Sequence, residues 1–312
     1  MTTEPLTLMA VHAHPDDEVV FTGGLLIRSH AEGIRTVLVC CTNGEEGEIH
    51  DPDLDPAEAQ ARLGEIRRNE LRCAAGSLAI DHLELLDYHD SGMAGTEANN
   101  NPACFHQADK DEAAARLVAL VRRYRPQVLV TYDEFGAYGH PDHIAANRIT
   151  HLAFDRAGDP AYRSDLGAPW APAKLYYTHW NDAGWRQARE MYLARGLKWP
   201  WDEEEEQTAD ADKDPATVSG DEEAHDAEVT AETQPPAYVP PPANTHLDVR
   251  PFVAAKMTAA QCHRTQFDPN GLFYTMPEDI TPVMWGEEHY SRVACRVAAP
   301  EEETDLFASL RD

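Results

Sequence analysis

The chain has 312 residues, of which 42% are hydrophobic and 26% charged, and its formal net charge is −29. Such an acidic chain is a poor partner for nucleic acid or for an anionic membrane surface, and no apolar run reaches the roughly 18 residues that a membrane-spanning helix needs. The length suits one large α/β domain with additions, or two domains.

The N-terminus and the cysteines indicate a cytoplasmic protein. The first residues contain neither the basic segment nor the small-residue cleavage site of a signal peptide. The six cysteines form no Cys-x-x-Cys pair, so we expect buried reduced thiols rather than a disulfide framework. They stand at positions 40, 41, 73, 104, 262 and 295. The oligomeric state is left open by the sequence.

Strand-like and helix-like segments alternate along the first 180 residues. Apolar runs rich in β-branched residues predict strands, and apolar residues at helical spacing next to Pro or Gly predict helices. The expected strands are 6–13, 35–41, 82–86, 127–133 and 174–178, and the expected helices are 23–33, 56–78, 110–126 and 140–158. This alternation predicts an α/β fold, with a Rossmann-like, mostly parallel open sheet flanked by helices over residues 1–180. A helical extension follows over 181–201.

Residues 202–244 differ in composition from the rest of the chain. The part from 202 to 232 carries 14 Asp or Glu and one Lys, and a Pro-rich stretch follows it. A segment with so few apolar residues cannot bury enough surface to offset the cost of ordering it. We therefore predict a disordered acidic insert, after which 245–312 form a smaller C-terminal α+β part. That part, with a helix at 252–267 and a strand at 288–294, is expected to complete the fold and the substrate site.

Two polar segments follow the first and fourth predicted strands. They are "AHPDDE" (13–18) and "YGHPDH" (138–143). Because ligands bind beyond the carboxyl ends of the strands in an open α/β sheet, we expect both segments at one edge. His14, Asp17 and His143 then supply two imidazoles and one carboxylate, with an open position for water. This is a donor set for catalytic zinc, or for iron(II).

The other polar residues of the two segments suit hydrolysis. Asp16 neighbours a ligand and is free to act as general base. Protonated His140 and the hydroxyl of Tyr138 are placed to stabilise an oxyanion. Asp142, from the same motif, is a further catalytic candidate.

Two other classes of protein fit the sequence less well. A nucleotide- or sugar-binding module on a Rossmann-like sheet would carry a Gly-x-Gly-x-x-Gly turn after the first strand, where carboxylates stand instead and would repel a pyrophosphate. A serine or cysteine hydrolase of the Gly-x-Ser-x-Gly type lacks its motif here.

The motifs resemble those of a known family. "AHPDDE" and "GHPDH" resemble the two signatures of the zinc-dependent PIG-L/LmbE-like N-deacetylases. The resemblance implies removal of the N-acetyl group from a GlcNAc-type glycoside, a small amino-sugar substrate, by metal-activated water. It also implies the metal and base roles given above, and it suggests that Arg67, Asp90 and Glu48 contact the sugar or inositol.

Within the family, three further stretches are most similar to the actinobacterial enzymes that act on N-acetylglucosaminyl-inositol in mycothiol biosynthesis. They are "GEEGE" (44–48), "DSGMAGT" (90–96) and "EEHYSRV" (287–293). The related mycothiol S-conjugate amidases resemble the chain at "HRTQFDPNGLFYTMP" (263–277), but Gly139 stands where they usually have Pro. The favoured activity is therefore the deacetylase. An S-conjugate amidase, or a deacetylase of another N-acetylglucosaminyl conjugate, stays as the alternative.

Overall fold

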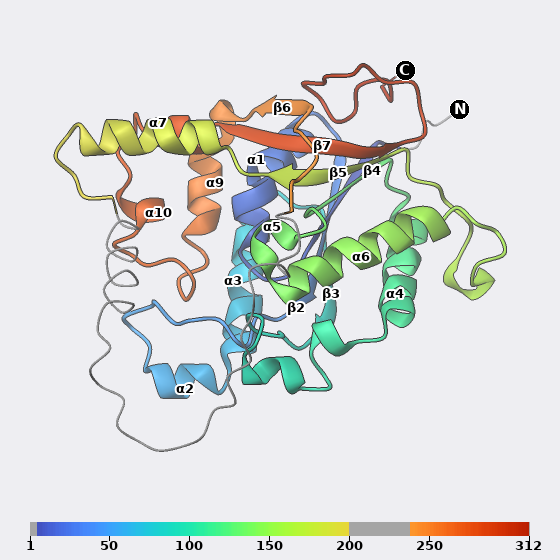
Figure 1. The fold of residues 1–312 in the computed structure, drawn as a ribbon, viewed down its shortest axis with the longest axis horizontal. Helices are drawn as coiled ribbons and strands as arrows, with labels where there is room; N and C mark the ends of the chain where they lie inside the picture. The colour runs from blue at the N-terminus through green and yellow to red at the C-terminus, as the bar shows by residue number, and fades with distance from the viewer. Residues whose placement is uncertain (1–4, 200–237, 312) are drawn as a thin grey trace, which may run out of the picture.

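A computed structural model describes residues 5–199 and 238–311. A seven-stranded sheet in the order β3-β2-β1-β4-β5-β7-β6 runs through its centre (Figure 1). The strands are β1 Thr7–His12, β2 Arg35–Thr42, β3 His82–Tyr88, β4 Val128–Thr131, β5 Lys174–His179, β6 Thr245–Asp248 and β7 Glu287–Cys295. The first five pair in parallel, whereas β7 is antiparallel to both β5 and β6. The predicted mostly parallel, Rossmann-like sheet is confirmed.

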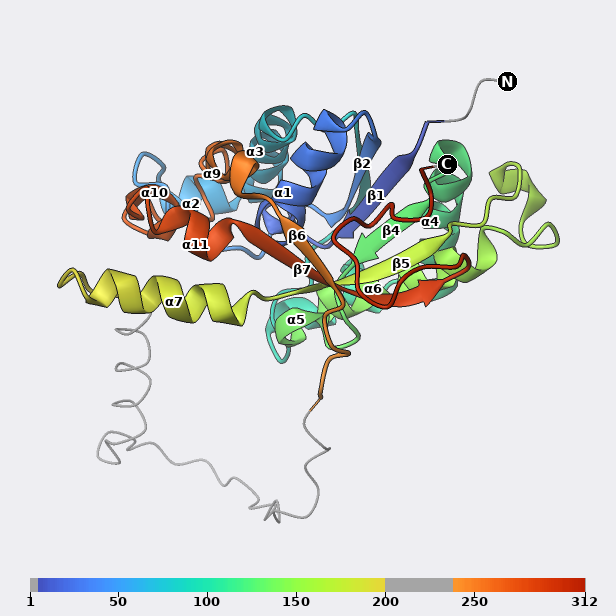
Figure 2. The same ribbon diagram turned by 90° about the horizontal axis from the view of Figure 1, so that it is seen from above.

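Helices cover both faces of this sheet (Figure 2). The α-helices are α1 Asp17–Ala31, α2 Pro56–Gln60, α3 Leu63–Ser77, α4 Lys110–Tyr124, α5 Gly136–Gly139, α6 Pro141–Arg156, α7 Asp182–Leu193, α9 Val253–Ala260, α10 Leu272–Thr275 and α11 Thr281–Trp285. On one face α1, α3 and α9 pack together over one hydrophobic core, and on the other α4 packs against α6 over a second. Within 5–199 and 238–311, none of the helices has the length and apolar character that crossing a bilayer requires.

The strand order fixes where a site can form. β1 and β4 are neighbours, but the helices that follow them, α1 and α6, lie on opposite faces of the sheet. At such a reversal the loops beyond the carboxyl ends of the two strands diverge and leave a crevice. The two polar motifs occupy these two loops.

Several element boundaries differ from the prediction. The helix expected at 23–33 begins at Asp17, because the acidic residues of the motif form its first turn rather than a loop. The helix expected at 56–78 is broken into α2 and α3, and the helix expected at 252–267 ends at Ala260. Strand β6 was not predicted, because it is only four residues long and pairs with β7 some 40 residues later.

Most of the predicted disordered insert, up to residue 237, lies outside the described residues. Its last seven residues, 238–244, are described and run beside β7. The carbonyls of Pro241 and Pro242 both accept from Ser291 Oγ at 2.8 Å, and the amide of Asn244 donates to Tyr290 O at 3.0 Å. Residues 238–244, which the sequence assigned to the disordered insert, therefore include ordered residues bonded to β7.

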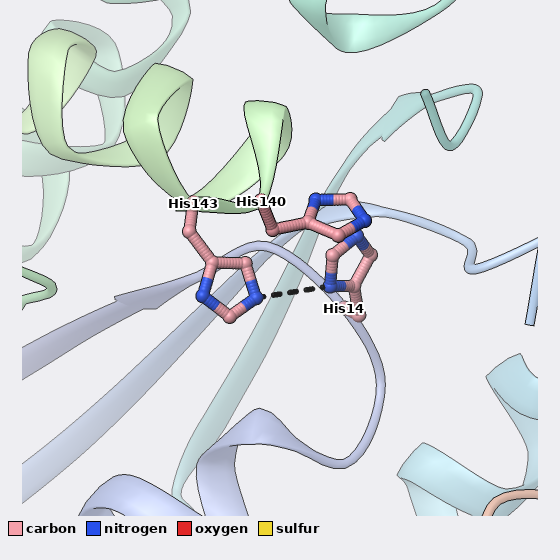
Figure 3. A group of neighbouring side chains, drawn as sticks. All are labelled: His14, His140 and His143. Carbon is pink, nitrogen blue, oxygen red and sulfur yellow. Dashed lines mark hydrogen bonds between the residues drawn. The ribbon is translucent and has the colours of Figure 1, made fainter. Parts of the chain in front are cut away.

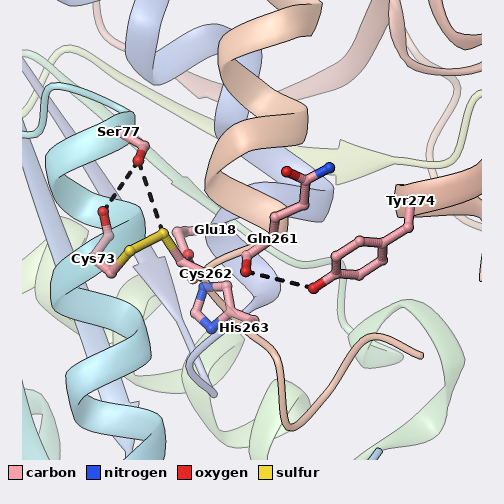
Figure 4. The surroundings of a disulfide bond; sticks show 7 residues. All are labelled: Glu18, Cys73, Ser77, Gln261, Cys262, His263 and Tyr274. Carbon is pink, nitrogen blue, oxygen red and sulfur yellow. Dashed lines mark hydrogen bonds and ion pairs between the residues drawn. A yellow bond between two sulfur atoms is a disulfide. The ribbon is translucent and has the colours of Figure 1, made fainter. Parts of the chain in front are cut away.

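One expectation about the cysteines was wrong. Cys73 on α3 and Cys262, just after α9, form a disulfide (Figure 4). The two residues are 189 positions apart in sequence, but the packing of α9 against α3 brings their Cα atoms to 5.7 Å, within the range a disulfide needs. Sequence spacing alone cannot reveal such a pair. Of the other four, Cys40, Cys41 and Cys104 are buried free thiols and Cys295 is an exposed one.

The C-terminal part is bonded into helix α1. The backbone amides of Gly24 and Leu25 donate to the carboxylate of Glu288 at 2.7 and 2.8 Å. Lys256 Nζ bonds the same carboxylate at 2.8 Å and the carbonyl of Val20 at 3.2 Å. In a regular helix the Gly24 amide would donate to the Val20 carbonyl. Here the amide donates to Glu288 and the carbonyl accepts from Lys256, so the buried Lys–Glu pair replaces a backbone hydrogen bond in the middle of α1.

The Gly23-Gly24 pair makes this approach possible. A Cβ atom on Gly24 would lie 2.6 Å from Val249 side-chain atoms, and one on Gly23 would lie 3.2 Å from Lys256 Cγ. Side chains at these positions would push the 249–256 segment away from α1. The residues from 245 onward therefore complete the same layer of the fold.

Candidate active site

The loops after β1 and β4 meet at the carboxyl edge of the sheet around a cavity of about 170 Å³. Figure 3 shows the ring of His14, from the loop after β1, next to the rings of His140 and His143, which come from the start of α6. Seven of the ten predicted site residues line the cavity: His14, Asp16, Asp17, Arg67, Asp90, Tyr138 and His140. His143 and Asp142 are fully buried behind its wall. Glu48 does not line it.

The three predicted metal ligands are in mutual contact. His14 Nδ1 lies 3.3 Å from His143 Nε2 and 3.4 Å from Asp17 Oδ2, and His143 Nε2 lies 3.4 Å from Asp17 Oδ1. Ligand atoms placed about 2.0–2.1 Å from a tetrahedral zinc ion are about 3.3 Å from one another. The two imidazoles have this spacing, and the Asp17 carboxylate presents one oxygen to each of them, so these three side chains could hold one divalent ion.

Neighbouring groups orient two of these ligands. Asp17 Oδ2 accepts from the His14 amide at 2.8 Å and from Tyr132 OH at 2.7 Å. The other nitrogen of His14, Nε2, faces Asp142 Oδ2 at 3.4 Å and Asp90 Oδ1 at 3.6 Å. A carboxylate that receives the proton of one ring nitrogen leaves the other nitrogen with a lone pair for a metal. His14 Nδ1, which faces Asp17 and His143, is that nitrogen.

The electrostatics of the cluster also favour a cation. Burial alone would lower the pKa of His14, but Asp90, Asp142 and Asp17 raise it well above its usual value. Burial lowers the pKa of His143 to about 3, although Asp17 opposes this shift. The carboxylates thus attract positive charge between the rings, and His143 is a neutral imidazole, the form that ligates a metal.

Asp16 stands at the cavity wall with a carboxylate suited to proton transfer. Burial raises the pKa of Asp16 to about 7, although the nearby guanidinium of Arg67 opposes the shift. Arg67 Nη2 donates to Asp16 Oδ2 at 3.1 Å. A carboxyl group that titrates near neutral pH is a suitable general base.

Arg67 does more here than the sequence predicted. Its guanidinium donates to the carbonyls of Pro15 and Gly44, both at 2.7 Å, and the residue is only 3% exposed. Cβ atoms on Gly44 and Gly47 would lie 2.2 and 2.5 Å from Arg67 Nη1. The glycines of "GEEGE" therefore give room to this guanidinium, which supports the Asp16 loop while one side of it lines the cavity.

His140 and Tyr138 present donors to the cavity. His140 Nδ1 accepts from the Asp142 amide at 3.2 Å, so the proton of the neutral ring sits on Nε2. Burial, together with the charge of His14, lowers the pKa of His140 to about 4, which favours this neutral form over the protonated one expected from the sequence. Tyr138 is 49% exposed, and its hydroxyl lies 3.5 Å from His143 Nε2. Burial of the phenol raises the pKa of Tyr138, so it remains a donor.

Asp142 and Glu48 have surroundings that differ from the expectation. Asp142 is fully buried and accepts from the Ser91 amide at 2.9 Å and from the Ser91 hydroxyl. It lies next to His14 Nε2, at 3.4 Å, and does not line the cavity. The Glu48 side chain is 84% exposed and pairs with His50 at 3.2 Å. Glu46, two residues earlier, lines the cavity instead.

Sequence reasoning also missed Tyr132 and Ser91. Tyr132 directly follows β4, so its place at the strand end was a usable signal. Ser91 adjoins the predicted Asp90, but its bonds to Asp142 join residues 51 positions apart. Such a pairing is visible only in the folded chain.

Comparisons with known proteins cover the segments that form this site. A profile of the family described as "PIG-L: GlcNAc-PI de-N-acetylase" matches residues 9–154, which include both motifs. A protein of Geodermatophilus obscurus is 40% identical over 97% of this chain and 97% of its own length. One of Streptomyces avermitilis is 39% identical over 96% of each. Both are named 1D-myo-inositol 2-acetamido-2-deoxy-alpha-D-glucopyranoside deacetylase.

Solved structures share the fold at low sequence identity. The conserved protein TT1542 from Thermus thermophilus has a TM-score of 0.55 and 20% identity, over 95% of this chain and 98% of its own. The A40926 pseudoaglycone deacetylase Dbv21 has a TM-score of 0.51 and 15% identity, over 94% and 98%. A hydratase, GalB from Pseudomonas putida, reaches 0.55 at 16%, over 95% and 99%. The fold alone therefore does not select the reaction.

The fold, the His/Asp cluster able to hold a metal ion, and the relatives together define an N-deacetylase, a hydrolase of an N-acetyl amide. Eleven of the twelve residues that line its cavity lie within residues 9–154, the part of the chain that the family profile covers. The chain belongs to the PIG-L family.

Proposed function

We propose that the chain removes acetate from 1D-myo-inositol 2-acetamido-2-deoxy-α-D-glucopyranoside, the N-acetylglucosaminyl-inositol of mycothiol biosynthesis. The identity of 40% with a relative of that name, across 97% of both chains, supports this substrate. The single observation that carries the chemistry is the cluster of His14, Asp17 and His143 beside the carboxylate of Asp16, which lines the same cavity as His14 and Asp17.

His14, Asp17 and His143 would hold the metal ion, for which we favour zinc over iron(II). When bound, such an ion supplies the Lewis acidity that activates water and polarises an amide carbonyl. The side chains of Asp17 and His14 are held by Tyr132 and Asp142, so these two ligands need little rearrangement to bind a metal.

The side chains around this set carry the proton transfers. Asp16 takes a proton from the attacking water, and as the amide oxygen gains negative charge it receives hydrogen bonds from His140 Nε2–H and Tyr138 OH. The proton held by Asp16 is then available to the departing amine. Because both donors are neutral in this cavity, stabilisation of the oxyanion does not require a charged His140.

The residues that line the cavity indicate which side chains contact the sugar. Asp90 and Arg67 stay as predicted contacts, and Glu46 takes the place predicted for Glu48. Carboxylates are suitable acceptors for the hydroxyl groups of a sugar or an inositol.

A matched activity assay tests the proposal. Purified, metal-loaded protein is given N-acetylglucosaminyl-inositol, N-acetylglucosaminyl-malate and a mycothiol S-conjugate at equal concentrations, and free amine is measured. We expect the highest kcat/KM with the inositol glycoside. A higher value with the S-conjugate would make the chain an amidase, and Asp16→Asn serves as the control for background hydrolysis.

A further inference from the structure

Asp16, the proposed general base, has a strained backbone. Its φ of 122° and ψ of −31° place it in a region that L side chains rarely adopt. Residues in such conformations persist only where the surrounding structure holds them, and they gather at functional sites. The groups that hold Asp16 therefore decide where its carboxylate points.

Two partners hold this residue. Arg67 bonds the preceding carbonyl of Pro15 and the Asp16 carboxylate from the cavity side. The Asp16 amide donates in the other direction, to Glu18 Oε2 at 2.9 Å. Glu18 is fully buried and does not line the cavity.

Glu18 is itself fixed by a distant residue. Its second oxygen, Oε1, lies 2.7 Å from His263 Nε2, and both side chains are buried. Figure 4 shows His263 beside Glu18, directly after Cys262 of the disulfide to α3. The same helix α3 carries Arg67, so both supports of Asp16 are anchored to it.

We propose that Glu18 and His263 are positioning residues for deacetylation, which hold the strained Asp16 backbone so that its carboxylate faces the water-binding side of the cavity. The proposal rests on the proposed function, in which Asp16 is the base. Glu18 acts through the Asp16 amide and His263 acts through Glu18, and neither touches the substrate.

The test compares two substitutions of one residue. Glu18→Ala removes the acceptor for the Asp16 amide. Glu18→Gln keeps it, because the glutamine carbonyl accepts that bond, and its amide donates to His263 Nε2 once the ring proton of the neutral imidazole moves to Nδ1. We expect Glu18→Ala to lower kcat about tenfold to a hundredfold, the scale of a small misplacement of a catalytic group. KM and metal content should stay within about twofold of the wild type, and Glu18→Gln should recover kcat to within about threefold.

Glu303→Ala is the matched control for loss of a buried carboxylate. Glu303 pairs with Lys174 at the opposite end of the sheet, so this variant should lower the melting temperature without changing kcat. If Glu18→Ala does not fold, His263→Leu and His263→Gln are compared by the same criterion, because glutamine keeps a donor toward Glu18.

A double-mutant cycle separates positioning from a merely structural role. In an Asp16→Asn background, where no base remains to be positioned, Glu18→Ala should change the residual kcat by less than about threefold. An equal loss in both backgrounds, or wild-type kcat in folded Glu18→Ala, overturns the proposal. If Asp16→Asn itself keeps wild-type kcat, the base role fails instead, and the two failures are thereby distinguished.

Discussion

His14 uses its two ring nitrogens for different neighbours. One nitrogen faces the carboxylates of Asp90 and Asp142, and the other faces Asp17 and His143. A ring held in this way gives up little conformational freedom when it ligates. The metal affinity of the site should therefore depend on few side chains.

Substitution of the ring ligands should remove the metal. We expect about one equivalent of divalent ion per chain in the wild type, and a loss of that ion in His14→Ala and in His143→Ala. His151→Ala is the control, because His151 pairs with Tyr177 outside the cavity. Elemental analysis of folded, dialysed protein measures the content, and a metal-free wild type after supplementation would contradict the ligand set.

The adjacent carboxylates of Asp16 and Asp17 should separate by role. Asp16→Asn should keep the metal but lose about 10²–10⁴-fold in kcat, the usual contribution of a positioned general base. Asp17→Ala should lose affinity for the metal, since it removes a carboxylate whose two oxygens face the rings of His14 and His143. Paired metal titration and kinetics check this, and identical metal binding by the two variants would count against the assignment.

For single residues, the sequence predicted correctly which side chains of the two motifs lie close together. His14, Asp17 and His143 lie together as expected, because two strand ends carried matching motifs. Glu48 was expected in the cavity, and Glu46 is found there instead. The direction in which a side chain leaves a turn depends on the backbone angles, which the residue types alone do not determine. Glu18 and His263, 245 positions apart, were beyond any local pattern.

Helix α1 shows how tightly an element is fitted to its neighbours. Gly24→Ala should destabilise the protein by about 1–3 kcal/mol, because its Cβ would overlap Val249. Gly76→Ala, in helix α3 with no atom within 4 Å of a Cβ, should instead stabilise it by about 0.5–1 kcal/mol. Chemical denaturation of both variants gives the free energies of unfolding. Equal effects would show that α1 does not need the close approach.

The disulfide between Cys73 in α3 and Cys262 after α9 can be tested by counting free thiols. Protein purified without reductant and titrated with a thiol reagent in denaturant should show four free thiols rather than six. Cys73→Ser should expose the partner and give five. Six thiols in the unreduced wild type would show that the Cys73–Cys262 bond does not form.

Most elements were predictable, and their boundaries were less so. The buried strands were found because all six residues of β1 are buried and apolar runs mark such strands. The start of α1 was missed because its first turn carries Asp17 and Glu18, which are buried by contacts with His14, Tyr132 and His263 rather than by hydrophobicity. Tertiary contacts of this kind leave no periodic signal.

At the scale of the whole molecule, Tyr238 connects the end of the predicted acidic insert to the rest of the fold. This residue donates to Glu134 at 2.5 Å and stacks on Phe135, in the loop that leads to Tyr138. Deletion of 204–236, with a Gly/Ser linker, should leave metal content intact and shift stability by only about 1 kcal/mol or less, because loop length carries a small entropic cost.

Deletion of 204–240 should behave differently, because it also removes Tyr238 and its contacts with Glu134 and Phe135. We expect a lower kcat/KM in the longer deletion than in the shorter one. Thermal melts and steady-state kinetics of the two deletion variants test this expectation. A collapsed melt in the shorter deletion would show that residues 204–236 contribute to the folded core, against their composition.

The bonds from Glu288 to helix α1 set the order in which the molecule can be completed during its synthesis. Gly24 and Glu288 are 264 positions apart, and a ribosome adding about 5–20 residues per second needs roughly 13–53 s to cover that interval. His14, Asp17 and His143 have all emerged well before its end. During that time the nascent chain exposes two amides of α1 and, once β5 has been made, the unpaired edge of that strand, which β7 will cover. Folding of this enzyme therefore depends on contacts between its first helix and its last strand, and the nascent chain is most exposed to misassembly just before its final residues are added.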